Sequence, residues 1–107
     1  MTNQAYSVSV PVLAVSDSVA GSGTIRYDNA QSGMVYVPAG SSLTSLTWHA
    51  SLFEEGPYIA ADDSAGAALV QTVAAGQAHP IPAALQGAMF LRITGNVAGE
   101  VGYTLKD

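Results

Sequence analysis

The chain has 107 residues, of which 49% are apolar and none is cysteine, and it carries a net charge of -5 at neutral pH. This length suits one domain with one core, and without cysteine there can be no disulfide, thiol nucleophile or cysteine-based zinc site. Three basic residues against eight acidic ones would repel a phosphate backbone, so we expect no nucleic-acid partner.

Residues 5–15 alternate between apolar and polar side chains, a pattern typical of a half-buried strand. The predicted apolar face consists of Tyr6, Val8, Val10 and Val12. Pro11 cannot donate a backbone hydrogen bond, so it favours an edge strand or a bulge. Residues 1–4 are polar apart from Met1 and are expected to form a flexible N-terminal arm. They contain no basic segment followed by an apolar one, so they do not predict a secretory signal.

Two short strands are predicted next, at residues 24–27 and 34–37, with a turn at 28–33 between them. Together they resemble a hairpin. The strongest predicted strand follows at residues 43–53, where two alternating sets of side chains share opposite faces. The apolar set is Leu46, Trp48, Ala50 and Leu52, and the polar set is Ser45, Thr47, His49 and Ser51. We expect Trp48 at the centre of the core.

The second half of the chain predicts further short strands at 58–60, 68–73, 89–94 and 100–105. Residues 75–82 contain a glycine and two prolines, so we expect an irregular or edge segment there. A single helical turn is predicted at residues 83–86, started by Pro82 and stopped by Gly87. The predicted core anchors are Trp48, Leu46, Leu91 and Ile93.

These elements amount to about eight short strands with turn signals every 8 to 12 residues. The pattern predicts one all-β domain over residues 1–107, a β-sandwich or jelly-roll-like fold of antiparallel strands. No apolar run reaches about 18 residues, so we expect no membrane span.

Few residues could carry metal chemistry. His49 and His79 are the only imidazoles, and neither has a zinc-binding spacing around it. Asp62 and Asp63 could offer oxygen ligands to Ca²⁺, but the spacing of a calcium loop is missing and an ordinary turn uses the same residues. Glu54 and Glu55 precede a Gly-Pro turn, where solvated acids are usual. We therefore predict no metal site.

The sequence also lacks the patterns of common catalytic and cofactor sites. The G-x-S-x-G elbow that presents a serine nucleophile is absent, as are the glycine-rich loops that hold phosphate. We predict no catalytic residues, no cofactor and no enzymatic activity. Carbohydrate binding stays open as an alternative, because β-sandwiches bind sugars with exposed aromatic rings. The rings available are Trp48, Tyr27, Tyr36, Tyr58 and Tyr103, although Trp48 and Tyr27 alternate with aliphatic residues as core residues do.

Charged side chains make up 10% of the sequence, against about 25% in average soluble proteins. Small and uncharged polar residues must therefore cover most of the surface. Such a surface can contact other proteins without burying unpaired charges. The composition favours a member of a protein assembly.

One stretch, residues 45–99, resembles the small cysteine-free β-domains of bacteriophage virion proteins and covers about half of the chain. The resemblance lies in Trp48, Ala50, Ser51, Tyr58, Asp63, Gly66, Val73, Ala74, Ala75, Gly76, Pro80, Pro82, Leu85, Gly87, Ala88, Gly95 and Asn96. It implies a head decoration (cement) protein, or a related capsid or tail accessory subunit. The alternative function is a carbohydrate-binding or tail-fibre adhesion module.

The resemblance implies a homotrimer that binds between subunits of the major capsid protein and stabilises the shell. The protein would be made in the host cytoplasm and located on the exterior of the capsid in the virion. An exposed strand edge can bind a neighbour through backbone groups alone. We therefore expect contacts with a neighbouring subunit from Tyr6, Val8, Val10 and Pro11.

Overall fold

The computed structural model describes residues 11–28, 30–63 and 65–106. Over these residues it contains nine strands and two 3-10 turns. The strands are β1 (Val12–Val15), β2 (Thr24–Arg26), β3 (Ser32–Tyr36), β4 (Ser45–Ser51), β5 (Ile59–Ala60), β6 (Val70–Thr72), β7 (Ala78–Pro80), β8 (Phe90–Gly95) and β9 (Gly99–Lys106). The 3-10 turns are η2 (Val19–Gly21) and η3 (Ala83–Leu85).

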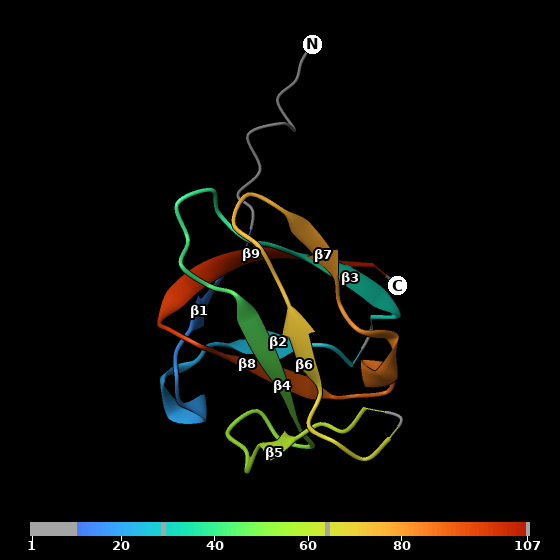
Figure 1. The fold of residues 1–107 in the computed structure, drawn as a ribbon. Coiled ribbons are helices and arrows are strands. Elements are labelled where there is room, and N and C mark those ends of the chain that lie inside the picture. The colour runs from blue at the N-terminus through green and yellow to red at the C-terminus, as the bar shows by residue number, and fades with distance from the viewer. Residues whose placement is uncertain (1–10, 29, 64, 107) are drawn as a thin grey trace.

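The strands form two antiparallel sheets, which confirms the predicted all-β sandwich (Figure 1). The first sheet has the order β1-β9-β3-β7. The second has the order β2-β8-β4-β5, and β6 also pairs with β4. Strand β4 therefore has β8 along one edge, and β5 and β6 share its other edge at opposite ends.

The core lies between the two sheets. The first sheet contributes Leu13, Val15, Val35 and Val101, and the second contributes Ile25, Leu46, Trp48, Leu91 and Ile93. The indole N–H of Trp48 donates a hydrogen bond to Gln71 Oε1 at 3.1 Å, so the ring is buried without leaving its polar atom unpaired. All four predicted core anchors are fully buried.

The predicted hairpin over residues 24–37 is wrong. Its two strands belong to different sheets, because β2 pairs with β8 and β3 pairs with β9 and β7. The N–H of Tyr27 still donates to the carbonyl of Met89 at 2.8 Å, whereas the N–H of Gln31 donates to the carbonyl of Lys106 at 2.8 Å. The chain therefore leaves the second sheet at Tyr27 and joins the first at Gln31.

The predicted inward face of the first strand is also wrong within the described residues. Leu13 and Val15 point into the core, and Val12 is 63% exposed. Tyr6, Val8 and Val10 lie outside the described residues, as does the expected arm at 1–4. The edge position is confirmed, since β1 ends the first sheet. The exposed Pro11 precedes it and accepts a hydrogen bond through its carbonyl from the Tyr103 N–H.

Several predicted elements are confirmed and others need smaller corrections. The helical turn is η3, with Pro82 before it and Gly87 at φ +96° after it. Strand β4 ends at Ser51, so Leu52 does not continue its inward face and is exposed. His79, expected in a loop, lies in β7 at the edge of the first sheet.

Candidate functional site

Exposed apolar side chains gather at one end of the sandwich. There β4 ends and β5 runs back along it, on the side of the molecule that lies farthest from β3 and β9 (Figure 1). Leu52 is 72% exposed, Ile59 70% and Phe53 60%. Among the described residues, these three side chains and Val12 on the first sheet are the four most exposed large hydrophobic ones.

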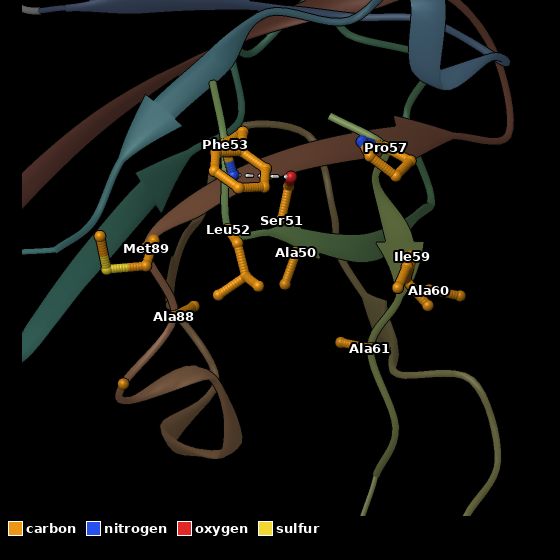
Figure 2. A pocket seen from close by; sticks show the side chains of 11 residues that line it. Ala50, Ser51, Leu52, Phe53, Pro57, Ile59, Ala60, Ala61, Ala88 and Met89 are labelled. Atoms are coloured by element: carbon orange, nitrogen blue, oxygen red, sulfur yellow. Dashed lines mark hydrogen bonds between the residues drawn. The ribbon is translucent and has the colours of Figure 1, made fainter. Parts of the chain in front are cut away.

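These side chains border an open pocket of about 430 Å³ (Figure 2). One wall consists of the end of β4, the following loop and β5, and the other consists of residues 87–89, which follow η3. Every side chain that lines the pocket is apolar except that of Ser51. We call this feature the end pocket.

Local hydrogen bonds explain why the chain turns here. The Ser51 hydroxyl oxygen accepts a hydrogen bond from the Phe53 N–H at 3.0 Å, visible in Figure 2. The N–H of Gly56, at φ +99°, donates to the carbonyl of Phe53, and the Tyr58 hydroxyl donates to the carbonyl of Glu54 at 2.7 Å. The Glu-Glu-Gly-Pro sequence therefore folds as a turn and leaves Phe53 and its neighbours facing solvent.

Opposite the loop, the second wall depends on the segment after η3. The Ala88 N–H donates to the carbonyl of Leu85 at 3.0 Å, and Leu85 is buried in the core. Gly87 takes the left-handed conformation that this turn requires. Ala88 thereby packs against the edge of the core, and both Ala88 and Met89 line the pocket.

Three exposed acidic residues lie within two positions of the pocket lining in the chain. Glu54 and Glu55 are exposed and stand between two lining residues, Phe53 and Pro57. Asp62 is exposed and directly follows the lining residue Ala61. On the outer face, Arg26 is also near Glu54, but its Nε lies 3.2 Å from Asp28 Oδ1 in the single ion pair of the described residues.

The two histidines lie on different sheets. His49 is on the outer face of β4, as expected, with its Nε2 atom 3.0 Å from Thr94 Oγ1. Partial burial disfavours its charged form and lowers its pKa. His79 Nε2 accepts a hydrogen bond from the Ala74 N–H at 3.2 Å. His49 is thus bonded to the neighbouring strand β8, and His79 to the backbone of the loop that precedes β7.

The acidic residues considered as calcium ligands form a turn. Asp63 Oδ1 accepts hydrogen bonds from the N–H groups of Ala65 at 2.8 Å and Ala67 at 3.0 Å, which is how aspartate stabilises such turns. In the part of the chain that the structure describes, no three His, Cys, Asp or Glu side chains come together as metal ligands would.

In the part of the chain that the structure describes, the aromatic rings considered for sugar binding do not gather on one exposed face. Trp48 and Tyr27 are fully buried, as predicted, and burial raises the pKa of Tyr27. Tyr36 is exposed on β3, with its hydroxyl 3.2 Å from Thr104 Oγ1. Tyr58 is half-buried on the other sheet, with the Arg92 guanidinium carbon 4.4 Å from its ring centre.

Sequence reasoning missed the end pocket. The alternation predicts Leu52 on the inward face and Met89 on the face of Leu91 and Ile93, and it predicts no site at Ile59. The signal that could have found it is the apolar pair Leu52 and Phe53 placed directly before a strong turn sequence, where side chains are normally polar.

No protein-family model, no curated protein and no solved structure matches this chain. Among the residues that the structure describes, no helix has the length and apolar character needed to cross a membrane.

Proposed function

We propose that this protein is a non-enzymatic structural subunit of a larger assembly, and specifically a decoration (cement) protein of a bacteriophage capsid. The observation that carries the proposal is the end pocket, with exposed Leu52, Phe53 and Ile59 around it. Contiguous exposed apolar surface is unfavourable in water and marks sites that another molecule covers.

Two further observations support this function. The low charge of the surface lets other protein surfaces pack against it at little desolvation cost. The resemblance of residues 45–99 to small virion β-domains suggests that this assembly is a phage capsid. A trimer seated between capsid subunits would cover the apolar end and would stabilise the shell through contacts rather than chemistry.

Strand β1 offers a second contact. It is the edge of the first sheet, and an exposed strand edge can add a strand from a neighbour through backbone hydrogen bonds. The N-terminal residues Tyr6, Val8 and Val10, with Pro11, would reach that neighbour. Deletion of residues 1–10 should then weaken assembly much more than folding, as measured by shell binding and by urea unfolding of the same variant.

The experiment that tests the function examines purified phage particles from the host that carries the gene. We expect mass spectrometry to find the protein in the particles in amounts comparable to those of the shell subunit. Particles made without it should lose DNA at lower temperature, and added protein should restore their stability. Absence from the particles would overturn the proposal, and a glycan that changes the tyrosine fluorescence would favour the adhesion module instead.

A further inference from the structure

We infer that the end pocket receives an apolar side chain from a different protein, on a segment that carries lysine or arginine beside that side chain. The inference rests on the proposed function, because it names the chemistry of the partner in the assembly. It separates that partner from two other occupants, a small apolar molecule and a second copy of this chain.

The lining of the end pocket calls for an apolar occupant. Ser51 supplies its one polar side chain, and the Ser51 hydroxyl oxygen already accepts the Phe53 N–H. A polar group placed there would lose its hydrogen bonds to water with little in exchange. An aliphatic or aromatic side chain would instead bury apolar surface on both sides.

The openness of the walls favours a protein segment over a small molecule. Small-molecule sites usually enclose most of the ligand surface. Here Leu52 and Ile59 are themselves more than two-thirds exposed, so a ligand confined to the pocket would leave them in water. A protein surface can place one side chain in the pocket and cover both residues around it.

The rim determines which charges the partner needs. Glu54, Glu55 and Asp62 are exposed, and each lies within two positions of a lining residue in the chain. Opposite charges across the rim of an interface favour association and exclude wrong partners. A partner with lysine or arginine beside its apolar side chain would meet these three carboxylates.

A second copy of this chain cannot supply those charges well. Arg26 is paired with Asp28. Arg92 is half-buried over Tyr58 and donates hydrogen bonds to Thr24 Oγ1 and to the carbonyl of Val19. Of the three basic residues of the chain, this leaves Lys106, and two copies would each carry a net charge of -5. Charge complementarity therefore indicates a different, more basic protein.

The test uses the full chain with labelled alanine and methionine methyl groups, observed by NMR. The probes are three synthetic hexapeptides: Leu-Phe between pairs of lysines, Leu-Phe between pairs of glutamates, and Ser-Ser between pairs of lysines. The methyl groups of Ala50, Ala61, Ala88 and Met89 report on the pocket. We expect the lysine-flanked Leu-Phe peptide to shift these signals at the lowest concentration, with an advantage over the glutamate peptide that shrinks as salt is raised.

Matched variants separate the pocket from general stickiness. The pair Leu52→Ser and Ile59→Ser should weaken binding of the lysine-flanked Leu-Phe peptide about tenfold or more. The control pair Val12→Ser and Val70→Ser removes side chains that are 63% and 55% exposed outside the pocket and should leave binding unchanged. All four positions are exposed, so both variants should fold.

Several outcomes would overturn the inference: equal binding of the lysine and glutamate peptides, no binding of the lysine-flanked Leu-Phe peptide, or no loss in the Leu52→Ser, Ile59→Ser variant. Self-association that this variant abolishes would assign the pocket to a second copy. Incorporation into phage particles is measured separately. A protein that enters particles yet shows no peptide preference keeps the proposed function and loses this inference.

Discussion

Trp48 and Leu52 stand four residues apart in a stretch where every second side chain is apolar, yet Trp48 is fully buried and Leu52 is 72% exposed. Trp48 lies where the first sheet covers β4, and its neighbour on β8, Ile93, is also fully buried. Leu52 lies beyond the end of β4. Similar side chains therefore serve the core in the middle of the sandwich and remain available to a partner at its end.

The largest expected effect comes from a substitution in the core, where the first sheet covers β4; we call this the covered region. Trp48→Ala should lower the free energy of unfolding by about 3–5 kcal/mol, because it leaves a large cavity and deprives Gln71 Oε1 of its donor. Leu52→Ala should change it by less than about 0.5 kcal/mol. Urea unfolding followed by circular dichroism measures both. Similar losses in the two variants would contradict the contrast between the regions.

The second prediction tests how tightly the covered region is packed. A Cβ atom at Gly33 would lie 2.5 Å from the carbonyl oxygen of Thr104 and 2.7 Å from Ile81 Cδ1. Gly33→Ala should therefore destabilise the protein by about 1–3 kcal/mol through overpacking. Gly40→Ala is the matched control, since a Cβ atom there meets nothing within 4 Å. Thermal unfolding should show a lower midpoint temperature for Gly33→Ala than for Gly40→Ala. Equal midpoints would contradict the packing argument.

A third prediction concerns the end of β4 that is opposite to the end pocket. There Asn96 Oδ1 accepts hydrogen bonds from the N–H groups of Thr44 at 2.8 Å and Ser45 at 3.2 Å. Asn96→Ala should destabilise the protein by about 1 kcal/mol, as measured by urea unfolding. Hydrogen exchange should become faster at these two amides, whereas unchanged exchange would show that water replaces the side chain without loss.

The smallest expected effect is a pH dependence from the outer face of β4. Burial lowers the pKa of His49 below its ordinary value of 6.5, so the folded state favours the neutral ring. Above pH 6.5 the ring is neutral in both states, and as the pH falls below that value the unfolded state gains the proton first. The free energy of unfolding should therefore decrease as the pH is lowered below 6.5, and it should decrease less in His49→Gln. Parallel pH profiles of the two proteins would contradict the prediction.

Period-two patterns predicted the parts of the fold that depend on one sheet face. Trp48 and Ile93 could be placed in the core because each stands between polar or charged neighbours along its strand, and Leu91 shares the face of Ile93. The pattern failed at Val12. Leu13 follows Val12 directly and is also apolar, so alternation alone does not decide which of the two faces the core. It failed at Leu52 because alternation does not reveal where a strand ends.

Pairing between distant segments was beyond the sequence patterns. The sequence over 27–31 has turn residues that suit a hairpin, but the N–H of Tyr27 bonds to Met89, directly before β8, and that of Gln31 to Lys106 in β9 of the other sheet. The end pocket combines residues 50–61 with residues 87–89. No local pattern joins these segments, so only the folded chain places Met89 and Ile59 around the same pocket.

The position of β9 has a consequence for the rate of folding. This strand lies between β1 and β3, so that Val12 pairs with Gly102 and Ser32 pairs with Lys106. The first sheet cannot form from neighbouring segments, because a long loop of chain must close before these pairs add any stability. Domains dominated by such distant contacts fold on the scale of about milliseconds to seconds. The open strand edges of the second sheet should then stay accessible to other chains for that time. Synthesis at high protein concentration should therefore favour aggregation over folding.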